Sequence, residues 1–126
     1  MSSETKHQAI IDWLNQELKP MLDASQQATY VYVCDEHKLC NQKFAAMLGY
    51  KSAQHWSADN VPFLDAFVAE GSENTLLSAY QNAMDHGVGS SSEVVWKKKT
   101  GGTVTTQVIL VPLSYQGQRF ALHFIS

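Results

Sequence analysis

The sequence predicts a single α+β domain in which a five-stranded antiparallel sheet carries short helices on one face. The chain has 126 residues, the size of one ordinary domain, and its 44% hydrophobic and 17% charged residues are typical of a globular protein. Helical periodicity marks the beginning and the middle of the chain. Runs of β-branched and aromatic residues follow the first helix and fill the last third. Because strands bracket helices, one antiparallel sheet with helices packed on it is the simplest arrangement.

The chain begins with a predicted amphipathic helix. Ile10, Leu14 and Leu18 recur at helical spacing, with polar residues between them, and Trp13 lies beside this apolar stripe. Pro20 lacks a backbone N–H and is expected to kink or break the helix. The apolar stripe fits two arrangements: the helix covers the open face of its own sheet, or it docks with the same helix of a second copy.

Residues 30–40 have the pattern of a β-hairpin. An apolar, β-branched strand is followed by a polar turn that includes His37, and a short return strand ends at the second cysteine. Asn41 is a favourable N-cap for a short helix, which Gly49 is expected to end. A further helical turn is predicted to reach Trp56.

A longer helix is predicted from near Ser72 to Gly87. Its apolar positions are Leu76, Leu77, Tyr80, Ala83 and Met84. The last third then predicts three antiparallel strands, at residues 94–98, 103–111 and 119–125. For all strands to share one sheet, the first strand of the chain must pair with one of these three, most simply with the last.

Several of these segments resemble a known family. The run YVYVCDEHKLCNQKFAAMLGY at residues 30–50 resembles the opening of a PAS domain, with an apolar strand ending in Asp35, a turn and an Asn-initiated helix. WKKKTGGTV at residues 96–104 resembles the family's hairpin, and residues 111–125 resemble its last two strands. The resemblance covers residues 29–126 and leaves residues 1–28 as an N-terminal helical extension.

The resemblance implies a sensory signalling domain, which holds a small ligand or cofactor between sheet and helices or holds none and dimerises. The expected pocket-lining residues are large side chains on the internal helices and the meander, namely Phe44, Leu48, Trp56, Phe67, Leu77, Tyr80, Met84 and Trp96. Because PAS domains commonly pair through such helices, we expect a homodimer. The side chains expected to form its contact are Ile10, Trp13, Leu14 and Leu18.

Two alternatives stand beside the sensor. One is a small enzyme of the isomerase or hydrolase type, for which Tyr80 with Asp65 would be the site, although no familiar catalytic motif occurs in the chain. The other is an interaction module with a filled core and no ligand. Paired titrating groups in a polar pocket would favour the enzyme over the sensor.

The sequence offers few cofactor ligands. Cysteinyl-flavin photochemistry uses a cysteine inside an Asn-Cys-Arg sequence on a helix, whereas Cys40 precedes its asparagine at a strand end. A non-covalent flavin would have Trp56 and Trp96 as neighbours. Haem would need an axial histidine. The candidates are His55, His86 and His123. We favour neither cofactor, so the ligand stays unnamed.

A metal site is not predicted. Cys34, His37 and Cys40 lie in one hairpin, but structural zinc sites usually take four ligands at tighter cysteine spacing. We expect two core-side thiols and an exposed turn histidine.

The composition argues against several other functions. A net charge of −3 gives no general attraction to nucleic acid or anionic membranes, and the basic run at residues 97–99 alternates between strand faces. No apolar run is long enough to cross a bilayer, and the first residues lack the apolar stretch of a secretory signal. Two cysteines are too few for a disulfide scaffold. We therefore expect a cytoplasmic protein with no nucleic-acid or membrane partner.

Overall fold

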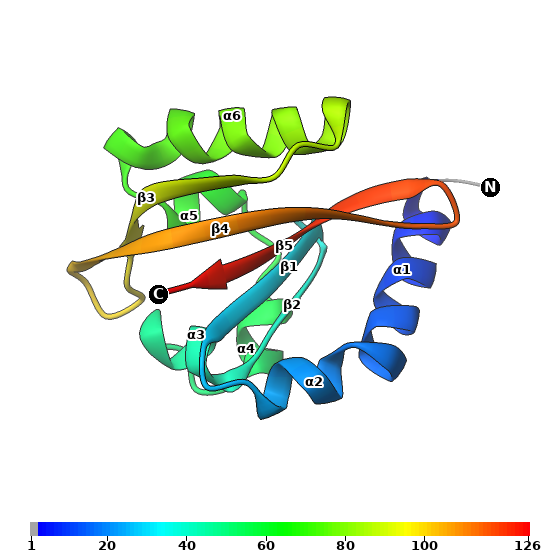
Figure 1. Ribbon diagram of the computed structural model, residues 1–126. Coiled ribbons are helices and arrows are strands. Elements are labelled where there is room, and N and C mark those ends of the chain that lie inside the picture. Colours follow the sequence, from blue (N-terminus) through cyan, green and yellow to red (C-terminus); the bar gives the residue numbers. More distant parts are fainter. Residues whose placement is uncertain (1–2) are drawn as a thin grey trace.

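The computed structural model describes residues 3–126, and helices and strands follow one another in the predicted order (Figure 1). The helices are α1 (Ser3–Glu17), α2 (Lys19–Ala24), α3 (Gln42–Met47), α4 (Ala53–Ser57), α5 (Phe63–Phe67) and α6 (Glu70–His86). The strands are β1 (Ala28–Cys34), β2 (His37–Cys40), β3 (Ser90–Lys97), β4 (Thr103–Tyr115) and β5 (Gln118–Ile125). None of the helices within residues 3–126 has the length and apolar character needed to cross a bilayer.

The strands form one sheet in the order β2-β1-β5-β4-β3, and every neighbouring pair is antiparallel. The pairing of β1 with β5 joins the N-terminal hairpin to the C-terminal meander, and it places Tyr30 opposite His123. This pairing confirms the predicted five-stranded antiparallel sheet. The hairpin turn is shorter than expected, because His37 already belongs to β2.

The two faces of the sheet carry different helices. Side chains alternate along a strand, so Tyr30 and Tyr32 of β1 face one way and Val31 and Val33 face the other. The tyrosines pack with side chains from α3, α4, α5 and α6. The valines pack with α1 and α2, and Figure 1 shows α1 well separated from α6. The short internal helices therefore share one face, as predicted, while the N-terminal helices cover the opposite one.

The N-terminal helix packs on its own sheet. Ile10 and Leu14 are 1% and 0% exposed within the single chain, because both insert against the sheet. In the single chain these two side chains, which were expected to form a dimer contact, are therefore covered by the chain's own sheet. Trp13 is half-buried and stacks on Tyr115, with ring centroids 4.8 Å apart, and Leu18 is half-buried beside the same cluster. The homodimer itself stays a prediction.

Helix α1 ends where the proline was expected to end it. Glu17 is its last residue, and Pro20 lies in the first turn of α2, where a missing N–H costs no helical hydrogen bond.

Candidate functional site

Most of the side chains predicted to line a pocket fill the core instead. The five that are almost completely buried are Phe44, Leu48, Trp56, Phe67 and Trp96. The four aromatic rings among them pack against one another, with centroids 5.4 Å apart for Phe44 and Trp96 and 5.5 Å apart for Trp56 and Phe67, and the Trp96 ring also meets that of Tyr30. Met84 is half-buried in a separate cluster beneath β4 and β5. None of these six residues lines the pocket described below, because the large side chains pack against one another in the core.

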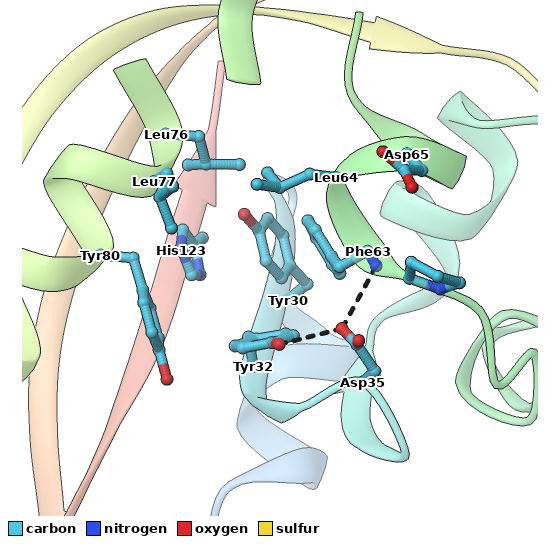
Figure 2. A pocket seen from close by; sticks show the side chains of 11 residues that line it. Tyr30, Tyr32, Asp35, Phe63, Leu64, Asp65, Leu76, Leu77, Tyr80 and His123 are labelled. Carbon is cyan, nitrogen blue, oxygen red and sulfur yellow. Dashed lines mark hydrogen bonds between the residues drawn. The ribbon is translucent and has the colours of Figure 1, made fainter. Parts of the chain in front are cut away.

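The structure contains a pocket on the same face of the sheet, beside the core that these side chains fill. It lies between α5 and α6 over strands β1 and β5, and its volume is about 350 Å³ (Figure 2). This volume is at the lower end of the range for small-molecule sites. Its lining includes Leu77 and Tyr80, two of the residues expected to line a ligand pocket. The lining residues outside that expected set are Tyr30, Tyr32, Asp35, Pro62, Phe63, Leu64, Asp65, Leu76 and His123.

The floor of the pocket is a stacked pair of rings from adjacent strands. The rings of Tyr30 and His123 lie 3.9 Å apart at an interplanar angle of 7°. Tyr30 is 0% and His123 is 2% exposed, yet neither the Tyr30 hydroxyl nor His123 Nδ1 has a hydrogen-bond partner among residues 3–126. Figure 2 shows the Tyr30 hydroxyl pointing toward the leucines of α5 and α6. Because buried polar atoms are nearly always hydrogen-bonded, these two unpartnered atoms are an exception within the described residues.

One carboxylate organises the rim of the pocket. Asp35 Oδ1 accepts hydrogen bonds from the Tyr32 hydroxyl at 2.9 Å and from the backbone N–H of Phe63 at 3.2 Å (Figure 2). The carboxylate thus fixes the end of β1 and the start of α5 at the same point. Its remaining lone pairs can accept from a ligand.

The three phenols of the pocket are hydrogen-bond donors at neutral pH. Burial raises the pKa of Tyr30, and burial reinforced by Asp35 raises the pKa of Tyr32. Burial also raises the pKa of Tyr80, whose ring meets that of Tyr32 edge to face at 5.3 Å. Each hydroxyl therefore keeps its proton.

A flavin and a haem, the two cofactors considered from the sequence, do not fit the interior between the sheet and the short helices. The interior between the sheet and α3–α5 is occupied by Trp56, Trp96 and their aromatic neighbours, so a flavin ring or a haem has no room there. Of the three histidines considered as haem ligands, His55 and His86 are exposed, and His123 borders the pocket. Burial lowers the pKa of His123 to about 3, so its ring is neutral at physiological pH.

Tyr80 and Asp65, the two residues considered for catalysis, do not lie together in the structure (Figure 2). Tyr80 and Asp65 both border the pocket, but Figure 2 shows them on opposite walls, one on α6 and the other on α5. General acid–base chemistry needs both groups within hydrogen-bond reach of the same reacting atoms.

The hairpin histidine is not exposed, contrary to the expectation. His37 is 6% exposed, and its Nδ1 lies 3.1 Å from Cys34 Sγ. Cys40 packs in the opposite, aromatic core, where burial raises the pKa of its thiol to about 12.

Comparisons with solved structures identify the fold. A PAS domain from Colwellia psychrerythraea superposes with a TM-score of 0.68 at 19% identity, covering 91% of this chain and 96% of its own. A PAS domain of a two-component sensor histidine kinase gives 0.61 at 14% identity, covering 99% and 98%. Vibrio cholerae VqmA gives 0.66 at 10% identity, covering 87% of this chain and 49% of its own. No protein-family model and no curated protein matches the sequence. The chain has a PAS fold, as the resemblance implied.

Proposed function

We propose that this chain is a sensory signalling domain whose pocket between α5 and α6 binds a small polar aromatic molecule. The observation that carries the proposal is the pair of buried, unpartnered polar atoms, Tyr30 Oη and His123 Nδ1, on the floor of that pocket. A buried polar group left without a partner costs roughly 1–3 kcal/mol, which a ligand that satisfies it would recover.

The lining defines the chemistry of the ligand. The aromatic side chains of Phe63 and Tyr80 in the lining favour a flat ring. The hydroxyls of Tyr30 and Tyr80 can donate hydrogen bonds to a ligand, and the Asp35 carboxylate, which already accepts from Tyr32, has further lone pairs that can accept from one. A heteroaromatic ring that carries one hydrogen-bond acceptor and one donor therefore matches the walls better than a purely apolar or a fully charged molecule.

Two structural neighbours support a sensory role. One is the PAS domain of a two-component sensor histidine kinase, and another is VqmA, which has been observed bound to DPO. The PAS fold by itself hosts many functions, so the proposal depends on the pocket and not on the fold.

The ring 2-pyridone, which carries an adjacent N–H and C=O, is a minimal probe for this site. We expect it to shift the NMR signals of Leu77, Tyr80 and His123, and benzene, its apolar counterpart, to bind more weakly. Tyr30→Phe removes one hydrogen bond and should weaken 2-pyridone binding about fivefold, the equivalent of about 1 kcal/mol.

Tyr50→Phe is the matched control for this titration. The Tyr50 hydroxyl donates to Asp59 Oδ2 at 2.8 Å, and Tyr50 is not among the residues that line the pocket. Its replacement should leave 2-pyridone binding unchanged. Equal losses in the two variants, or shifts that fall outside the pocket, would contradict the proposal.

A further inference from the structure

A second group of side chains gathers where α1 meets the β1–β2 hairpin, and it comprises His7, Cys34 and His37. Each contributes a nitrogen or sulfur atom, and these atoms all lie within 4.8 Å of one another. His37 Nδ1 is 3.1 Å from Cys34 Sγ, and the rings of His7 and His37 meet edge to face with centroids 5.8 Å apart. The cluster is separate from the pocket lining, which includes none of the three.

The fold holds each member of the cluster in place. His7 precedes Ile10 by three residues and Leu14 by seven, so it lies on the same face of α1 as the two side chains buried against the sheet. Cys34 ends β1 and His37 begins β2, and the two residues are directly paired in the hairpin. The cluster is therefore set by helix packing and by strand pairing, not by a loop.

We propose that His7, Cys34 and His37 bind a transition-metal ion of the zinc class. A thiolate and two imidazoles are preferred ligands of Zn²⁺, with Zn–S of about 2.3 Å and Zn–N of about 2.0–2.1 Å. These lengths place tetrahedral ligand atoms roughly 3.3–3.6 Å apart. The observed separations need only small side-chain rotations to reach this geometry. His7 and Cys34 are half-buried, so an ion can reach the cluster.

The ion would connect two parts of the domain. One ligand lies on α1 and two lie on the hairpin whose turn carries Asp35, the carboxylate that anchors Tyr32 and the start of α5. Three protein ligands leave a fourth position for water or an incoming ligand. Metal occupancy would therefore fix α1 to the hairpin whose turn carries Asp35. The metal proposal does not depend on whether the pocket binds a ligand, because the metal cluster and the pocket lining share no residue.

Cobalt titration tests the site directly. The protein, prepared without a polyhistidine tag, is reduced, stripped with a chelator and titrated with Co²⁺. We expect one equivalent of Co²⁺ to produce the visible bands of a tetrahedral site together with a thiolate-to-cobalt charge-transfer band, and Zn²⁺ to displace it.

Single substitutions assign the ligands. Cys34→Ser should abolish the charge-transfer band, and His7→Gln should weaken Co²⁺ binding by more than about 100-fold, since loss of even a supporting partner costs roughly 10- to 100-fold. His7→Gln replaces a half-buried helix residue and should leave folding intact, which circular dichroism checks. Cys40→Ala and His55→Gln, which alter a thiol and an imidazole outside the cluster, should bind as the parent does. Absence of the charge-transfer band, unchanged affinity in His7→Gln, or an equal loss in His55→Gln would overturn the proposal.

Discussion

Replacing Asn41 with alanine is expected to lower the free energy of unfolding by about 4 kcal/mol. Its side-chain oxygen accepts from the backbone N–H groups of Thr29 and Phe44, each at 3.1 Å. Its side-chain nitrogen donates to the carbonyls of Leu22 at 3.0 Å and Gln27 at 2.8 Å. Asn41 is 1% exposed, so water cannot replace these partners. The substitution would remove four hydrogen bonds to backbone groups and loosen the contacts among α2, β1 and α3 at once. Urea denaturation of both proteins measures the difference.

Ser52→Ala is the matched control for this substitution. Ser52 caps α4 through one bond from the His55 N–H at 3.0 Å, at a more exposed position, so its loss should cost only about 1 kcal/mol. The excess in Asn41→Ala then reports the bonds beyond the helix cap. Equal losses in the two variants would show that Asn41 acts as a simple cap and does not join the N-terminal helices to the sheet.

Acidification is expected to destabilise the protein through His123. Burial lowers the pKa of His123 to about 3, whereas in the unfolded chain it titrates near its usual value of about 6.5. Below pH 6.5 the unfolded state therefore binds a proton that the folded state does not, and stability falls as the pH falls toward 3. At pH 5 this contribution amounts to about 2 kcal/mol, because each pH unit within the window is worth about 1.4 kcal/mol.

The His123→Phe variant isolates this contribution. A phenyl ring keeps the contact with Tyr30 and removes the titrating group, while the carboxylates of the chain are unchanged. The free energy of unfolding, measured from pH 7.5 to pH 4, should fall less steeply in the variant, with the two curves diverging below pH 6.5. Parallel curves would mean that folding does not lower the pKa of His123, contrary to this account.

The fold was predictable because its determinants are local. Asn41, the N-cap of α3, and Pro20, in the first turn of α2, set helix boundaries through their effect on neighbouring residues. The pairing of β1 with β5 followed from the requirement that both strand groups share one sheet. The surface against which α1 packs could not be predicted from the sequence. An apolar stripe such as that of Ile10 and Leu14 has the same pattern whether it packs on its own sheet or on a second copy.

The candidate sites were predicted less well, because they depend on which side chains meet across the core. Periodicity identified Trp56 and Trp96 as inward-facing but could not show that they fill the interior together. Strand alternation contained a usable signal, since Tyr30 and Tyr32 share one face of β1 and His123 lies opposite Tyr30. His7 had a comparable signal, its place on the buried stripe of α1, but its partners in the hairpin are remote in sequence.

Native mass spectrometry of the protein as purified from cells tests most directly whether the pocket between α5 and α6 holds a small molecule. The comparison variant is Leu77→Trp, which enlarges a side chain at the pocket wall that is 38% exposed and so tolerates the change. We expect the parent protein to carry a discrete non-covalent adduct that is released on denaturation, and the Leu77→Trp protein to be bare. The same spectra count the chains in each particle and so test the predicted homodimer. A parent protein without an adduct, or an adduct that persists in Leu77→Trp, would contradict the assignment of this pocket as the sensory site.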